Sequence, residues 1–484
     1  MSKIKNCFKI DSKYLSILLF FIVLALQTIL FFISVDDVFT HINIVKDCYN
    51  TSRQFNDVTT RFGFLTVNYI SYKYGLVARG LVNTIIYLLY MPAHWLLNIF
   101  GVNVSLIMFT AFCKYAFLVF MNVVLVFVMV RVLRVLHANI GNKAYYMYLM
   151  YICAMNVYVV GFEYRYTDYI LFMLQVAGVY FAIKRKEFLA LITMIVSLFV
   201  HEGSLLLSCP IVFIIIIAVH LHDDAKSKTK AYIKMVLMGM ILMLISMYFL
   251  KFQGYFYDES TIDKIHMDML TDLGYPINED TINRINVDCK LTRQIILCVG
   301  TTKWNASLTP SGEYDYASMF ISHLTTLFYA ITLLPIVICI AKRLIRNLKR
   351  TKSIFIKLEK LLIMTTGVIA MLPMIIFKED IARWITFIWV YYAFLGFYGL
   401  YTNSEVVIGA LDDMANKVKN LLAVSKTNIA PVLVYAVSIL PFGGGAINYV
   451  YLIICFEVVA PTMTKYFPGV LSKAVEIMQM INGG

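Results

Sequence analysis

The feature that most constrains this chain is a series of apolar runs, each about 16–25 residues long, separated by short polar segments. A hydrocarbon core of about 30 Å is crossed by roughly 20 residues of α-helix, which satisfies its own backbone hydrogen bonds in lipid. Only 15% of the residues are charged, against about 25% in soluble domains. We therefore expect an all-α polytopic membrane protein with about 11–12 transmembrane helices. The expected spans cover residues 14–33, 104–130, 144–161, 169–183, 188–200, 204–219, 232–250, 318–341, 360–377, 384–401, 428–441 and 446–460.

Clusters of lysine and arginine predict the orientation, because cytoplasmic loops of membrane proteins are enriched in these residues. Lysines precede the first apolar run, 14–33, which we interpret as a retained signal anchor with a cytoplasmic N-terminus. Further clusters at 184–186, 226–230, 342–352 and 417–426 fall on the same side when the runs are followed in turn, and so does the C-terminus. These clusters account for the net charge of +13, so the charge does not indicate a nucleic-acid partner.

We expect a single transmembrane domain over residues 1–484, because neither an internal repeat nor a low-complexity linker interrupts the pattern. The largest hydrophilic segment, 251–317, has more acidic than basic residues and is predicted to be an extracytoplasmic loop. The paired short runs at 188–219 and 428–460 are each predicted to form a hairpin. The alternative is one long tilted helix, which would reverse the orientation of everything after it. The apolar stretch 75–92 is interpreted as an interfacial, re-entrant or bundle-packed helix.

Ionisable residues from five separate segments gather on or just below the predicted outer face. Placing such groups at membrane depth costs free energy, so they normally face a cavity and have a functional role. A helical bundle can bring the five segments around one outward-open cleft. The residues are Asp36, Asp37, Arg79, Arg165, Asp168, His201, Glu202, Asp380 and Arg383.

Three of these residues are arginines, whose guanidinium groups bind phosphate oxygens bidentately and stay protonated. Arg79, Arg165 and Arg383 are candidates to clamp a diphosphate at the level of the lipid headgroups. The alternative is pairing with a nearby acid. The nearby pairs would be Arg165 with Asp168, and Arg383 with Asp380.

The other candidates are acid–base residues. His201 interrupts an apolar run and can act as a general base near neutral pH, with Glu202 as its partner or as a ligand of sugar hydroxyls. A polar hairpin tip ending at Gly203 is the alternative. Asp36 and Asp37 directly follow the first run and could serve as a base or bind a divalent metal with few ligands, or they are ordinary juxtamembrane charges. The sequence contains no CxxC pair, P-loop, Rossmann turn or HExxH motif, so we expect no metal and no cofactor.

Taken in order, these motifs resemble those of a known family. They are the Arg79-Gly80 step, the short turn with Arg165 and Asp168, the His201-Glu202 apex, the segment Asp380-x-x-Arg383-Trp384, and the large loop between the middle helices. The combination is similar to the Wzy-type oligosaccharide repeat-unit polymerases, which include O-antigen, capsular and exopolysaccharide polymerases.

The resemblance implies an enzyme of the bacterial cytoplasmic membrane that joins repeat units carried on undecaprenyl diphosphate at the outer face. Arg79, Arg165 and Arg383 would hold the leaving diphosphate. His201 would be the base, with Glu202 as its partner, and Asp168 is a further catalytic candidate. Asp36, Asp37 and Asp380 are additional site candidates. The implied partners are the lipid-linked glycan, membrane lipid and a chain-length regulator protein, with no cofactor, metal or nucleic acid.

Other functions remain open at this point. A glycosyltransferase using sugars on polyprenyl monophosphate would take Asp36 or Asp37 as its base. A flippase or other transporter should show repeats or broken helices in matching halves, whereas the break at Pro441 and Gly443–Gly445 has no earlier counterpart. An acyltransferase using His201 is a third alternative.

Overall fold

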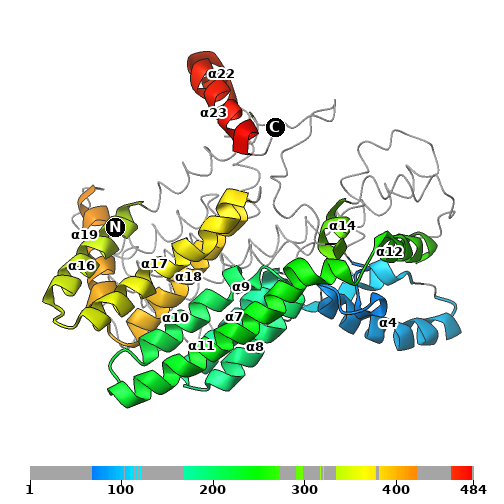
Figure 1. Cartoon of the computed structure of the whole chain (residues 1–484), viewed down its shortest axis with the longest axis horizontal. Coiled ribbons are helices and arrows are strands. Elements are labelled where there is room, and N and C mark those ends of the chain that lie inside the picture. The colour runs from blue at the N-terminus through cyan, green and yellow to red at the C-terminus, as the bar shows by residue number, and fades with distance from the viewer. Residues whose placement is uncertain are drawn as a thin grey trace, which may run out of the picture.

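The fold is described from a computed structural model of the chain (Figure 1). The structure describes residues 68–102, 104–110, 168–272, 290–297, 334–377, 381–421 and 459–481, and single positions between 112 and 120 and at 317 and 320. Every regular element in these residues is helical. Two helical stretches among them are long and apolar enough to cross a membrane, Gly80–Ile99 and Ala225–Tyr255. The prediction of a helical protein is confirmed for the described residues, whereas the polytopic membrane protein with about 11–12 spans stays a prediction.

The centre of the described molecule is a group of helices that lie side by side (Figure 1). They are α7 (Asp168–Ile183), α8 (Glu187–Val200), α9 (Ser204–Leu207), α10 (Cys209–Val219) and α11 (Ala225–Met247). Helices α7 and α8 pack closely, and α10 packs against α7. Their shared core is aliphatic, with Ile211, Ile215 and Leu242 fully buried. The apolar runs predicted at 169–183, 188–200 and 204–219 correspond to these helices.

The structure decides whether residues 188–219 form a hairpin or one long helix. His220 Nε2 at the end of α10 lies 3.4 Å from Glu187 Oε1 at the start of α8. A continuous helix would separate these residues by about 50 Å at 1.5 Å per residue. Helices α8 and α10 therefore form a hairpin, and its apex is His201-Glu202-Gly203.

Helix ends near basic residues differ from the prediction. Helix α11 begins at Ala225 rather than at 232, because Asp224 caps it by accepting hydrogen bonds from the backbone N–H groups of Lys226 and Ser227. Helix α16 (Leu334–Arg350) continues through basic residues that were predicted to be a loop, and α17 (Ile354–Phe377) begins before 360. Lysine and arginine are good helix formers, so hydropathy alone ends these helices too early.

A second apolar cluster joins segments that are far apart in the sequence. Helix α4 (Gly80–Ile99) follows the short helix η2 (Tyr72–Tyr74). The hydrophilic segment 251–317 is partly helical, with α12 (Glu259–Asp272) and α14 (Lys290–Leu297). The elements η3 (Tyr248–Phe252) and η4 (Gln253–Tyr255) connect α11 to α12. Ile70, Val77 and Phe249 are buried with residues of α12 and α14.

The remaining helices are α18 (Ile381–Tyr401), α19 (Glu405–Leu421), α22 (Ala460–Tyr466) and α23 (Pro468–Ile481). Helix α18 packs against α17, and α19 packs against α16. Helix α19 lies in a segment that was predicted to be a loop. The hairpin predicted at 428–460 lies outside the described residues, apart from its last two positions.

Candidate functional site

The structure describes the predicted site residues unequally. Arg79, His201 and Glu202 are described with their side chains. Asp168 is the first residue of α7 and Arg383 lies in the first turn of α18, but their side chains lie outside the described part. The other four candidates also lie outside the described residues: Asp36, Asp37, Arg165 and Asp380.

Arg79 and Glu202, 123 positions apart in the chain, form a bidentate ion pair. Arg79 Nη2 donates to Glu202 Oε1 at 2.5 Å, and Arg79 Nε donates to Glu202 Oε2 at 2.9 Å. The side chains are 20% and 15% exposed. Two candidates predicted from separate segments therefore meet, and the guanidinium fork of Arg79 holds a carboxylate in this structure.

His201 packs at the same apex with a side chain that is only 7% exposed. Its Nδ1 accepts a hydrogen bond from the backbone N–H of Gly203 at 2.9 Å. In the neutral ring the proton then lies on Nε2, because an accepting nitrogen carries none. His201 Nδ1 is also 3.6 Å from Glu202 Oε2, which makes an ion pair once the ring is protonated. The apex thus orients the ring, and Nδ1 must release Gly203 before it can accept another proton.

Gly203 leaves room for the His201 ring. A Cβ at this position would lie 3.1 Å from both Cε1 and Nδ1 of His201. Such a contact is tighter than most, so the ring would have to move by a few tenths of an ångström to admit a side chain here. The turn predicted at Gly203 is therefore present and also fixes the position of His201.

The backbone before Arg79 is held by a buried glutamine that sequence reasoning missed. Gln253 is fully buried and accepts a hydrogen bond from the backbone N–H of Ala78 at 2.7 Å. Its Nε2 donates to the carbonyl oxygens of Ile295 and Ile296 at 2.8 and 2.9 Å. This side chain therefore connects the segment leading to Arg79 with the end of α14. A polar residue just after an apolar run was the only sequence signal, and it is a common one.

One small apolar cluster brings the other predicted segments to this place. Leu171 of α7, Val200 of α8 and Phe387 of α18 are buried together, and Leu81 of α4 packs against them. Each lies within about one helical turn of a candidate residue. The pairs are Leu81 with Arg79, Leu171 with Asp168, Val200 with His201, and Phe387 with Arg383.

Helix ends of both polarities meet at this cluster, because α8 ends at Val200, which is buried in it. Helices α4, α7 and α18 begin at Gly80, Asp168 and Ile381, and residues from their first two turns pack in the cluster. A helix N-terminus carries a partial positive charge and favours anions. The C-terminal end of α8 opposes this effect here, so the charge that favours an anion is that of Arg79, and Glu202 supplies the anion from within the chain.

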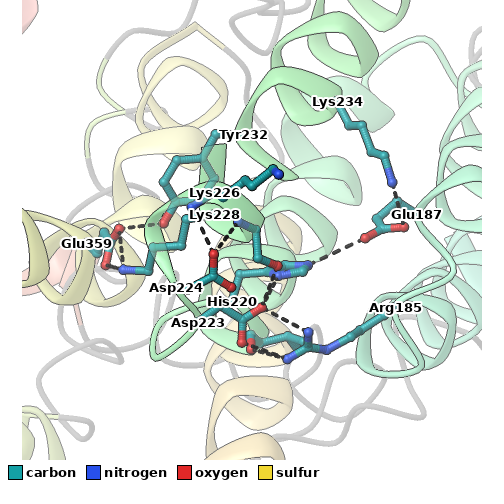
Figure 2. A network of polar contacts seen from close by, with 12 residues as sticks. Arg185, Glu187, His220, Asp223, Asp224, Lys226, Lys228, Tyr232, Lys234 and Glu359 are labelled. Atoms are coloured by element: carbon teal, nitrogen blue, oxygen red, sulfur yellow. Dashed lines mark hydrogen bonds and ion pairs between the residues drawn. The ribbon is translucent and has the colours of Figure 1, made fainter. Parts of the chain in front are cut away.

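A second polar network lies at the other end of the hairpin (Figure 2). Arg185 donates to both oxygens of Asp223 at 2.9 and 3.0 Å, and Asp223 also contacts His220 at 2.7 Å. Nearby, Lys228 Nζ lies 2.8 Å from Glu359 Oε2. Helix α8 rises about 21 Å between this network and the His201 apex. The network connects the α7–α8 turn, the α10–α11 turn and α17 at a place distinct from the candidate site.

The charges in this second network favour ionised Asp223. Hydrogen bonds from Arg185 and then His220 lower the pKa of Asp223 from 3.8 to about 2. Among the described residues no group of three histidine, cysteine or acidic side chains is placed to hold a metal ion.

Comparisons of this chain with protein-family models, curated proteins and solved structures find no match.

Proposed function

We propose that this chain is a polytopic glycosyltransferase of the bacterial cytoplasmic membrane that polymerises oligosaccharide repeat units carried on undecaprenyl diphosphate. The observation that carries the proposal is the Arg79–Glu202 pair. It joins a guanidinium fork to a carboxylate beside His201, at a cluster where segments of four predicted site residues meet. A diphosphate leaving group and an attacking hydroxyl need these two kinds of residue together.

Exposed apolar surface supports the membrane part of the proposal. Leu88 and Trp95 of α4 are 65% and 68% exposed, and Leu244 of α11 is 67% exposed. Both helices are long and apolar enough to span a bilayer. Water would penalise such side chains, whereas lipid accepts them. The remaining spans that we propose lie partly outside the described residues.

The two ends of the hairpin support the proposed orientation. The end with Arg185 and Lys228 carries basic turns, which the positive-inside rule assigns to the cytoplasm. The other end carries the Arg79–Glu202 pair. Helix α8 rises about 21 Å, less than a hydrocarbon core of about 30 Å. The pair would then lie below the outer boundary of the core.

The proposed reaction uses these residues as follows. An acceptor hydroxyl oxygen attacks the anomeric carbon of the donor glycan, and the bond from that carbon to the diphosphate oxygen breaks. The electron pair leaves with the diphosphate, whose charge Arg79, Arg165 and Arg383 stabilise. The hydroxyl proton passes to Glu202 or His201. Because Arg79 holds Glu202 in the present structure, the arriving diphosphate would take over the fork and release the carboxylate.

The alternative functions predict different results from the proposed polymerase. A transferase using sugars on polyprenyl monophosphate would depend on Asp36 or Asp37, so alanine at these positions should abolish its activity and only weaken a polymerase. A flippase would not form a glycosidic bond at all.

The length distribution of surface glycan tests the proposal, measured in source cells with the gene intact, deleted, or carrying Arg383→Ala. We expect both altered strains to lose long chains while a single repeat is still attached to its final carrier. Loss of every repeat would indicate a flippase. A repeat lacking one sugar would indicate the monophosphate-dependent transferase.

A further inference from the structure

The turn between α16 and α17 carries an unusual concentration of unpaired positive charge. None of its exposed cations makes an ion pair with an acid in the described part of the chain, whereas Arg343 of the same helix pairs with Asp413 at 2.7 Å. The stretch 334–358 contains no acidic residue. The exposed cations are Lys342, Arg346, Lys349, Arg350 and Lys352.

Exposed apolar side chains begin directly beside these cations. Ile354, Phe355 and Leu358 at the start of α17 are 59%, 74% and 55% exposed. On α16, Ile345 is 53% exposed between Lys342 and Arg346. Positive charge and exposed hydrocarbon therefore lie next to each other at the turn, which is the arrangement that side chains adopt at a membrane interface.

The other turns at this end of the molecule are different. Arg185 of the α7–α8 turn is paired with Asp223, and Lys228 of α11 is paired with Glu359. The α7–α8 and α10–α11 turns supply acidic residues that neutralise part of their own charge, and the α16–α17 turn has none. The exposed cations of this turn are therefore available to an anionic group from outside the described part of the chain.

We propose that the α16–α17 turn is a binding site for anionic phospholipid headgroups. The cations bind the lipid phosphates, and Phe355 and its exposed neighbours enter the acyl region below them. A soluble polyanion would neutralise the charge but would leave Phe355 and Ile354 in water, so a lipid surface fits both features. This site is independent of the proposed transferase activity and lies at the opposite end of the bundle from Arg79.

The test uses the full chain in nanodiscs that contain equal amounts of phosphatidylglycerol and phosphatidylcholine. Native mass spectrometry measures the ratio of the two lipids that stay bound on release. The variant R346Q/K349Q/R350Q removes three of the unpaired cations. The variant K184Q/K186Q/K226Q removes three exposed cations from neighbouring turns at the same end and is the matched control. The variant R346K/K349R/R350K keeps the charge.

We expect R346Q/K349Q/R350Q to lower the phosphatidylglycerol preference on the order of tenfold, because each basic residue near a surface attracts anionic lipid. The matched control and the charge-conserving variant should stay within about twofold of the unaltered protein. An unchanged ratio in R346Q/K349Q/R350Q, or an equal loss in the matched control, overturns the proposal. Polyglutamate that displaces phosphatidylglycerol from the unaltered protein also overturns it, in favour of an acidic protein partner. Thermal unfolding in neutral detergent shows that the variants are folded.

Discussion

Arg79 combines a strained backbone conformation with a positively charged side chain at the candidate site. Its φ of 61° lies in the left-handed region, which a residue with a side chain rarely adopts. Such a conformation costs about 1–3 kcal/mol and persists only where neighbouring contacts hold it. Here the hydrogen bond from Ala78 to Gln253 and the ion pair with Glu202 supply those contacts.

The guanidinium fork of Arg79 gives the first prediction. Arg79→Lys keeps the charge but loses the bidentate geometry, so we expect polymerisation of lipid-linked repeats to fall by at least about tenfold. Turnover of a purified repeat unit by the reconstituted protein measures this. Arg185→Lys is the matched control, because it removes the same kind of fork at the other end of the hairpin. Equal activity of Arg79→Lys and the unaltered protein would rule out the clamp role.

At the scale of elements, the hydrophilic segment after α11 is fastened to the site. Gln253 connects Ala78 with α14, and its neighbour Gly254 has no room for a side chain, because a Cβ would lie 2.4 Å from the carbonyl oxygen of Leu297. The two segments therefore approach each other backbone to backbone. This contact makes α14 part of the support of Arg79.

Gln253→Leu tests that connection. It leaves one buried N–H and two buried carbonyl oxygens without their partner, so we expect the free energy of unfolding to fall by about 2–4 kcal/mol. Gln175→Leu is the control. Gln175 is also buried, but it makes one long bond of 3.5 Å to Leu207, and its Oε1 has no partner in the described part of the chain. Thermal unfolding in detergent measures both, and an equal loss for the two variants contradicts the role given to Gln253.

The network around Asp223 connects helix turns and predicts a dependence on pH. The folded protein lowers the pKa of Asp223 from 3.8 to about 2. The stabilisation from ionised Asp223 is therefore fully present above pH 3.8 and is lost as the pH falls toward about 2. Asp223→Asn should unfold more readily than the unaltered protein at pH 5, and the difference should shrink as the pH falls below 3.8 and disappear below about pH 2. A difference that is constant over this range would show that the charge is not responsible.

On the scale of the whole molecule, the described helices separate two chemistries. One end has basic turns linked by ion pairs, and the other has Arg79, Glu202 and His201. In the proposed function, the basic turns would face the cytoplasm and the other end would bind the lipid-linked anion.

Cysteine labelling tests this orientation. Lys264 of α12 and Lys230 of α11 are both exposed. We expect Lys264→Cys to react with a membrane-impermeant maleimide in intact cells. Lys230→Cys should react only after the cells are permeabilised, because the proposed orientation places its end of α11 at the cytoplasmic side. The unaltered protein gives the background from native cysteines. Labelling of Lys230→Cys alone in intact cells would reverse the proposed orientation.

Length and hydropathy, read from the sequence alone, predicted the helices α7, α8 and α10, because a run of apolar residues is a local property. The same reasoning placed His201-Glu202-Gly203 at the break between two runs, since polar residues and glycine interrupt an apolar helix. The ends of α11, α16 and α17 were predicted less well. Lysine and arginine have polar hydropathy values, so a hydropathy pattern ends a helix at these residues even where they continue it.

Only the tertiary structure decided which polar groups meet. It paired Arg79 with Glu202, it closed residues 187–220 into a hairpin, and it placed Gln253 beneath the segment that precedes Arg79. These contacts depend on how helices far apart in the sequence pack against one another. The local pattern of polar and apolar residues does not determine how distant helices pack. An arginine that lies near an acid in the sequence can therefore form its ion pair with a residue from a distant segment instead.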